Sequence, residues 1–169
     1  TPDASFYSRP TATVDGAGDV YIGGNFTVAG DTVANRVAKW NGSGWSALGS
    51  GIGGAGPGGS NPYVNALAVS GNDLYVGGYF DGAGLIAANR VAKWGGNAWS
   101  ALGLGVGSAV YALAVSGTNL YAGGHFDTAG GNIAYRVAKW NGSAWSALGL
   151  GLNGDVTALT VSGSDLYVG

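Results

Sequence analysis

Short apolar runs separated by turn-forming residues recur along the whole chain. Between residues 110 and 148, apolar and aromatic residues gather in four runs of strand length, namely Val110–Val115, Leu120–Phe126, Tyr135–Trp140 and Ala144–Leu148. Gly, Asn, Ser and Asp fill the gaps, and these residues favour turns. The pattern therefore predicts a unit of four short antiparallel strands.

The gaps between these runs carry different turn signals. Ser116–Asn119 reads S-G-T-N, which is typical of a tight turn, and Asp127–Ile133 is a Gly-rich stretch that we expect to be a loop. Asn141-Gly142 lies between two aromatic-bearing runs. This dipeptide favours a hairpin turn in which both residues have positive φ.

The first run of each unit is apolar on both faces. In the second unit, Val64–Val69 reads V-N-A-L-A-V, whereas a strand with one side in water would alternate with polar residues. We therefore expect Val64–Val69 and Val110–Val115 to be innermost strands covered by neighbouring units. Trp99–Leu102 and Trp145–Leu148 are expected to be the outermost strands.

Two motifs repeat along the chain, and their copies are separated by the same intervals. The first, R-V-A-K-W-(N/G)-G-(S/N)-(A/G)-W-S-A-L-G, begins at Arg36, Arg90 and Arg136. The second, (L/V)-Y-(V/I/A)-G-G, begins at residues 20, 74 and 120 and recurs in truncated form at residue 166. Its tyrosines are 54, 46 and 46 residues apart, so the first interval contains an insertion.

The spacing of the motifs divides the chain into units. Four antiparallel strands in about 46 residues is the size of one β-propeller blade. We predict an all-β chain that is a partial β-propeller over residues 1–169, with about three and a half blades. The predicted blades are 1–49, 63–103 and 109–149, followed by a half blade at 155–169. The insertion, 51–62, is a Gly/Pro/Ser run that we expect to be a flexible loop.

Composition favours the all-β interpretation and excludes several partners. The chain has 35 Gly among 169 residues and lacks Glu, Gln, Met and Cys, so good helix formers are scarce and disulfides are excluded. Six of its seven basic residues lie in the R-V-A-K-W motif, which leaves no basic stripe for nucleic acid. No apolar run is long enough for a membrane-spanning helix. Low charge and abundant small residues resemble secreted bacterial repeat proteins, so we expect an extracellular or cell-surface location.

The second unit resembles a known repeat family. From Leu74 to Gly103 it reads L-Y-V-G-G-Y-F-D-G-A-G…N-R-V-A-K-W…W-S-A-L-G, which is similar to a kelch-type repeat of the galactose-oxidase-like propellers. In kelch repeats a Gly-Gly doublet ends the second strand, an aromatic residue lies on the third strand and a Trp begins the fourth. The Gly-Gly doublet, Trp94 and Trp99 occupy these three positions in this unit. The match departs from kelch in its two Trp only five residues apart. The opening T-P-D-A-S-F with V-Y-I-G-G-N-F also resembles short propeller repeats of bacterial surface proteins.

The resemblance implies a fold but no particular activity, because propellers host many functions. Propellers close with roughly four to eight blades, so three and a half blades leave two apolar faces open. We expect further blades of the same chain, or a second copy, to cover these faces. The end inside Y-V-G-G favours a longer parent chain.

Most repeated residues are predicted to be structural. We expect the Gly-Gly doublets to lie where a Cβ would clash, and the two Trp of each motif to meet across a hairpin. Each motif Arg is expected to latch adjacent blades and to stack on the Trp four residues later. The alternatives are an anion or sugar site at the Arg, or a sugar platform at an exposed outer Trp. The structural residues are Gly23, Gly24, Gly77, Gly78, Gly123, Gly124, Arg36, Arg90, Arg136, Trp40, Trp45, Trp94, Trp99, Trp140 and Trp145.

One end of the predicted blades is the favoured binding face. Because strands alternate in direction, the loop after the second strand and the connection between blades lie at this end, where loops vary freely. The residue after the Gly-Gly doublet also varies between units. The candidate ligand-binding residues are Tyr79, Asp81, His125 and Asp127. The alternative is that these residues are solvated strand ends and turn residues.

The sequence predicts no catalytic residue, metal ion or cofactor. His125 is the only histidine, and no calcium-loop pattern or carboxylate pair is found. The composition and motifs favour a non-catalytic binding or assembly scaffold whose partner is a protein or a glycan. The alternatives are a carbohydrate-binding propeller, or lectin, and an accessory propeller of an extracellular enzyme whose catalytic residues lie elsewhere.

Overall fold

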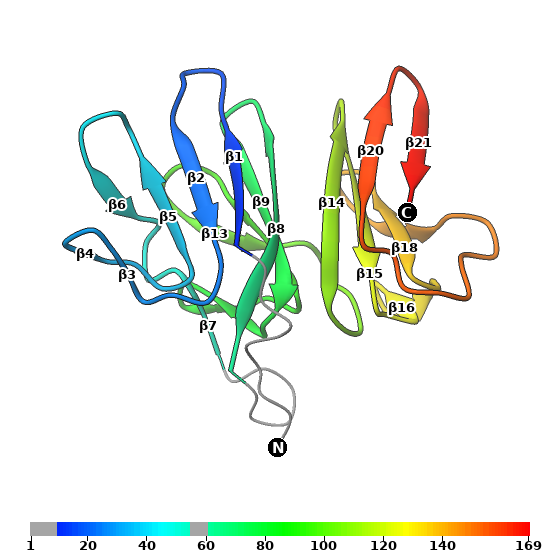
Figure 1. Ribbon diagram of the computed structural model, residues 1–169. Helices are drawn as coiled ribbons and strands as arrows, with labels where there is room; N and C mark the ends of the chain where they lie inside the picture. The colour runs from blue at the N-terminus through cyan, green and yellow to red at the C-terminus, as the bar shows by residue number, and fades with distance from the viewer. Residues whose placement is uncertain (1–9, 55–60) are drawn as a thin grey trace.

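The protein is built from antiparallel β-strands. The computed structural model describes residues 10–54 and 61–169, and within these residues it contains strands and no helix (Figure 1). Every strand pairing in the described residues is antiparallel, which confirms the all-β prediction. Residues 1–9 of the first predicted unit, and 55–60 of the insertion, lie outside the described residues.

Three four-stranded sheets and one two-stranded sheet form the frame. The first sheet contains β1 (Thr11–Val14), β2 (Val20–Gly23), β5 (Val37–Trp40) and β6 (Trp45–Ala47). The second contains β8 (Tyr63–Ser70), β9 (Asp73–Tyr79), β12 (Val91–Trp94) and β13 (Trp99–Ala101). The third contains β14 (Val110–Ser116), β15 (Asn119–Gly124), β18 (Val137–Trp140) and β19 (Trp145–Ala147). The last pair is β20 (Leu159–Ser162) and β21 (Asp165–Val168).

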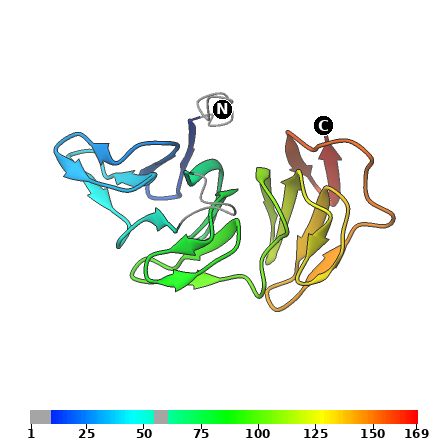
Figure 2. The ribbon, with the colours of Figure 1, turned by 90° about the horizontal axis from the view of Figure 1, so that it is seen from below.

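In each four-stranded sheet the strands follow one another in sequence order. The first strand therefore lies at one edge and the fourth at the other, as the apolar pattern predicts. The first strands contact one another from sheet to sheet, and Figure 2 shows the sheets following an arc with the first strands on its inner side. The apolar core fills the spaces between successive sheets. One core cluster joins Tyr21 and Val37 to Val64 and Val76, and another joins Val91 to Val110 and Leu120.

The segments after each second strand are short hairpins, where the sequence predicted loops. They are β3 (Val28–Ala29) with β4 (Thr32–Val33), β10 (Gly82–Ala83) with β11 (Ile86–Ala87), and β16 (Thr128–Ala129) with β17 (Asn132–Ile133). The start of the predicted insertion loop is also ordered. Ile52–Gly53 forms β7, which pairs with β10 of the next unit, and the Ile52 side chain is fully buried. The burial of Ile52 against the next unit holds this segment in place.

The turn between the third and fourth strands also differs from the prediction. Trp140 pairs with Trp145, so the loop contains four residues, and Gly142 has positive φ while Asn141 does not. The Asn141 Oδ1 atom accepts hydrogen bonds from the backbone N–H groups of Ser143 and Ala144 at 3.0 and 2.8 Å. The asparagine therefore stabilises the turn through its side chain, as Asn commonly does.

The Gly-Gly doublets lie where a side chain has no room, which confirms the prediction for all three. A Cβ added at Gly78 would lie 2.1 Å from the Tyr63 carbonyl oxygen, and one at Gly124 would lie 2.1 Å from the Ala109 carbonyl oxygen. At Gly23 the nearest atom would be Val64 Cγ1, at 2.5 Å. These contacts let the second strand lie close to the first strand of its own unit or of the next unit.

We predict that Gly78→Val lowers the free energy of unfolding by more than about 1 kcal/mol, because the added side chain meets rigid backbone. The control is Gly44→Ala, since Gly44 has no atom within 4 Å of an added Cβ and the other units carry Ala98 and Ala144 there. Urea denaturation measures both variants. Equal stability of Gly78→Val and the unmodified chain would contradict the packing argument.

Candidate functional site

Successive sheets meet at seams that repeat the same contact. Trp99 Nε1 donates a hydrogen bond to the Leu48 carbonyl of the preceding unit at 2.8 Å, and Trp145 Nε1 donates to the Leu102 carbonyl at 2.8 Å. The residue after each Leu is a glycine with positive φ. A Cβ added at Gly103 would lie 3.3 Å from the Trp140 ring. Each seam thus places indole rings directly on the backbone of the unit before it.

The hairpin after the second strand completes each seam. Gly84 N donates to Gly51 O at 2.8 Å, and Gly130 N donates to Gly105 O at the same distance. β10 pairs with β7 at the first seam, and a bridge between Val106 and Ala129 stands at the equivalent place in the second. The hairpins of one unit therefore extend the sheet contacts of the previous unit.

The motif arginines adopt an unusual backbone conformation. Arg36, Arg90 and Arg136 have φ of 65°, 63° and 65°, a region that residues with a Cβ rarely occupy. Arg36 uses this conformation to reach the segment between its own unit and the next, since its Nε donates to Pro62 O at 2.7 Å and its NH1 donates to Ile52 O at 3.1 Å. Burial lowers the pKa of the Arg36 guanidinium.

The predicted stacking of each Arg on the following Trp is wrong for Arg36 and Arg136, whose guanidinium groups contact backbone oxygens and carboxylates. The ring beside Arg90 belongs to Tyr79, whose centroid lies 6.0 Å from the guanidinium carbon. Positive φ breaks the side-chain alternation of a strand, so the Arg no longer shares a face with the Trp at +4.

The Trp pairs meet across their hairpins, as predicted. The ring centroids are 5.3 Å apart for Trp40 with Trp45 and for Trp94 with Trp99, and 5.6 Å apart for Trp140 with Trp145. The outer Trp of the second and third units are covered at the seams and do not form open sugar platforms. Trp45 has no unit before it among the described residues, and with Val20 and Trp40 it lines an open hollow of about 300 Å³.

The four candidate ligand residues fall at two different places. Tyr79 ends β9 and stacks on Tyr63, with ring centroids 5.7 Å apart and an interplanar angle of 24°. Asp81 follows in the same unit, and its backbone carbonyl accepts a hydrogen bond from Ala88 N at 3.0 Å. Tyr79 and Asp81 therefore lie with the second sheet, apart from the cluster that contains His125 and Asp127.

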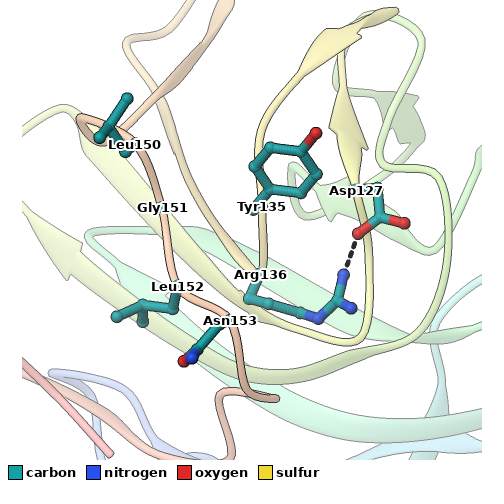
Figure 3. Close-up of a pocket in the computed structure, with 7 residues that line it drawn as sticks. All are labelled: Asp127, Tyr135, Arg136, Leu150, Gly151, Leu152 and Asn153. Carbon is teal, nitrogen blue, oxygen red and sulfur yellow. Dashed lines mark hydrogen bonds and ion pairs between the residues drawn. The ribbon is translucent and has the colours of Figure 1, made fainter.

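His125 and Asp127 join a charged cluster around Arg136, and Figure 3 shows Asp127 and Arg136 of this cluster. His125 Nδ1 lies 2.7 Å from Asp155 Oδ1, and Arg136 Nε lies 3.2 Å from the same oxygen. Arg136 NH1 forms an ion pair with Asp127 and donates to Phe126 O at 2.9 Å. The cluster links the third sheet to the segment before β20, and it borders an open hollow of about 650 Å³ with Tyr135 and residues 150–153.

Sequence reasoning missed Asp155 and Tyr63 as partners of the candidate residues. The residue before the first inner Val is Tyr63, Ala109 or Asp155, so this position varies between units. Tyr79 meets Tyr63 of its own unit, whereas His125 meets Asp155 of the following unit. The two pairings do not join equivalent positions, so the repeat gives no sequence signal for them.

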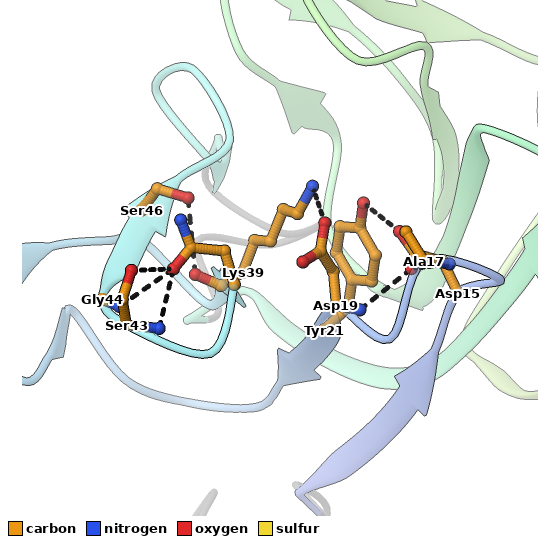
Figure 4. Close-up of polar contacts among 9 residues, drawn as sticks. Asp15, Ala17, Asp19, Tyr21, Lys39, Ser43, Gly44 and Ser46 are labelled. Carbon is orange, nitrogen blue, oxygen red and sulfur yellow. Dashed lines mark hydrogen bonds and ion pairs between the residues drawn. The ribbon is translucent and has the colours of Figure 1, made fainter.

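The opposite end of the sheets carries a different set of polar contacts (Figure 4). Lys39 forms an ion pair with Asp19 and lies 5.5 Å from the Tyr21 ring centroid. Tyr21 donates a hydrogen bond to Asp15 at 3.3 Å. Hydrogen bonding to Asp19 raises the pKa of Lys39, and burial raises the pKa of Tyr21. The second unit repeats the ion pair, with Lys93 Nζ 3.0 Å from Asp73.

Within the described parts of the chain, no group of three or more His, Cys, Asp or Glu side chains is placed to hold a metal ion. No helix in those parts is long and apolar enough to cross a membrane. The sequence matches no protein-family model and no curated protein.

We predict that Trp145→Phe lowers the free energy of unfolding by about 1 kcal/mol more than Trp45→Phe does. Both substitutions shorten the same motif side chain, but only Trp145 donates its indole N–H across a seam and is buried. Urea denaturation of the two variants gives the comparison. Equal losses for the two substitutions would show that the seam hydrogen bond contributes nothing to stability.

Proposed function

We propose that the chain is a segment of a kelch-like β-propeller and acts as a non-catalytic scaffold for binding or assembly in a secreted or cell-surface protein. The observation that carries this proposal is the repeated seam, in which Trp99 and Trp145 make the same 2.8 Å contact with the preceding unit. Repeat proteins build stiff frames from such nearest-neighbour joints. The kelch-like order of the Gly-Gly doublet and the two Trp is the reason for interpreting the units as propeller blades.

The charged side chains bond to one another and to the backbone, which supports a scaffold rather than an enzyme. At the loop end, Arg136 bonds Asp127 and a backbone carbonyl, and His125 bonds Asp155. At the other end, lysines pair with aspartates of the neighbouring strand. These side chains hold elements of the frame together, which is a structural role.

The outer faces of the segment support a role in assembly. Val28 and Val33 are exposed on the first unit, and Leu150 and Val168 are exposed at the other end of the arc. Exposed apolar patches of this kind mark surfaces that bind other protein. The partners that fit are further blades of the same type or another protein surface.

A glycan-binding propeller is the second candidate, and one observation favours it. Tyr63 and Tyr79 stack at the loop end of the second sheet, with the Arg90 guanidinium 6.0 Å from the Tyr79 ring. Aromatic rings beside a hydrogen-bond donor suit a sugar ring, which has an apolar face and hydroxyl edges. The seam Trp do not offer such a platform, because neighbouring units cover them.

A glycan array separates the two candidates. The scaffold proposal predicts that the labelled chain binds no glycan above the background given by a chain with Tyr79→Ala. The matched control is His125→Ala, which changes the equivalent position of the next unit. Glycan binding that Tyr79→Ala abolishes and His125→Ala preserves would overturn the scaffold proposal in favour of the lectin.

A further inference from the structure

In the third sheet, the backbone carbonyl that would accept an indole hydrogen bond at a further seam has no such donor among the described residues. In the second seam, Leu102 O accepts hydrogen bonds from Gly105 N at 3.0 Å and from Trp145 Nε1 at 2.8 Å. Leu148 O accepts the equivalent bond from Gly151 N at 3.0 Å, and no indole of the described residues donates to it. The Leu148 carbonyl therefore has the same local hydrogen bond as the other seam carbonyls and can accept a second one from an indole.

The apolar surface around this carbonyl is also uncovered. Ile52 is fully buried beneath β10 of the next unit, whereas Leu152, at the equivalent position, is 42% exposed. Leu150 beside it is 96% exposed. Both leucines line the hollow in Figure 3. In the first seam, a hairpin and two indole rings fill the corresponding space.

The inner half of this position is already filled. Cβ atoms added at Gly77 and Gly123 would meet Val110 and Val156, at 2.6 and 2.3 Å, so β20 approaches the third sheet as β14 approaches the second. β21 pairs with β20, and no described strand pairs with its other edge. A complete first unit of a second copy would overlap β20 and β21. The space fits only the outer half of a unit, which is one hairpin followed by two strands.

The strand β21 carries a negative charge at the position where the third strand of such a half-unit would place its lysine. Asp165 precedes L-Y at the position of Asp19 and Asp73, which form ion pairs with Lys39 and Lys93 of the third strand. Asp165 is exposed, and its carboxylate accepts a hydrogen bond from the hydroxyl of its neighbour Ser164 at 3.2 Å. An incoming R-V-A-K-W strand would bring a lysine to this carboxylate.

We propose that β21 and residues 148–152 form an acceptor site for an outer half-unit of this same repeat type. The occupant is a polypeptide with the pattern of residues 80–104. It adds to the sheet edge as a strand, donates one indole N–H to Leu148 O and places its lysine on Asp165. The inference rests on the proposed scaffold function and specifies which polypeptide the scaffold accepts.

The second sheet predicts the register of this pairing. There, Ala92 lies opposite Val76 and Trp94 lies opposite Leu74. By equivalence, the Ala of the incoming V-A-K-W strand lies opposite Val168 and its Trp lies opposite Leu166. The glycine in the turn of its hairpin then donates to Gly151 O, as Gly84 N does to Gly51 O.

The direct test uses a fluorescent synthetic peptide with the sequence of residues 80–104 and the full chain. Fluorescence anisotropy is expected to report saturable binding of one peptide per chain. Trp99→Ala in the peptide removes both the indole donor and a large, partly buried ring, so it is expected to weaken binding at least about 30-fold. A peptide of the same composition in scrambled order is the control for non-specific apolar binding.

A charge exchange tests the register. Asp165→Lys in the chain, or Lys93→Asp in the peptide, is expected to weaken binding by about fivefold, the effect of one exposed ion pair. Combining the two changes is expected to restore it. Asp31→Lys in the chain is the matched control, because Asp31 is exposed in the β3–β4 turn of the first unit, away from the proposed acceptor, and its replacement should leave binding unchanged.

Three results would overturn the proposal. They are failure of the peptide to bind, equal binding of the scrambled peptide, and insensitivity to the charge exchange. Light scattering adds a fourth outcome, in which copies associate through their β21 edges and excess peptide does not disperse them, which would make the occupant a second copy. A negative peptide result leaves the glycan-array outcome unaffected, so the failures of the two proposals are distinguishable.

Discussion

The hydrogen bond from a fourth-strand indole to a leucine carbonyl of the preceding unit determines how the sheets fit together. An indole N–H 2.8 Å from a backbone oxygen brings a whole ring onto the main chain. Gly49 and Gly103 follow the two acceptor leucines, with φ of 59° and 57°, and an added Cβ would lie 3.3 Å from a Trp ring at either position. The W-S-A-L-G sequence thus contains the donor of one seam and the acceptor of the next, which is why it repeats as a block.

Features set by neighbouring residues could be predicted from the sequence. Trp40 and Trp45 bracket a turn, so pairing of the strands brings their rings together. The Gly-Gly doublet predicts close backbone approach, and Gly78 against the Tyr63 carbonyl fulfils it. The order of strands in each sheet follows from short connections and alternating direction. The apolar character of both faces of the first strands indicated that neighbouring units cover them.

Features that depend on distant partners could not be predicted in this way. Ile52–Gly53 lies in a Gly-rich run, and only its pairing with β10 of the next unit makes it a strand. Positive φ at Arg136 has no local sequence signal, because Arg rarely adopts it and the surrounding contacts maintain it. The link between His125 and Asp155 joins residues from two successive units. In these cases, the tertiary contact determines the local structure.

The exchange of indole protons measures the seam directly. The chain contains six Trp, and the indole N–H signals of a ¹⁵N-labelled sample can be followed by NMR as the solvent is changed to D₂O. The account predicts that the indole protons of Trp99 and Trp145 exchange at least about tenfold more slowly than that of Trp45, because each is held by a seam hydrogen bond. Equal exchange rates for Trp45, Trp99 and Trp145 would contradict the account.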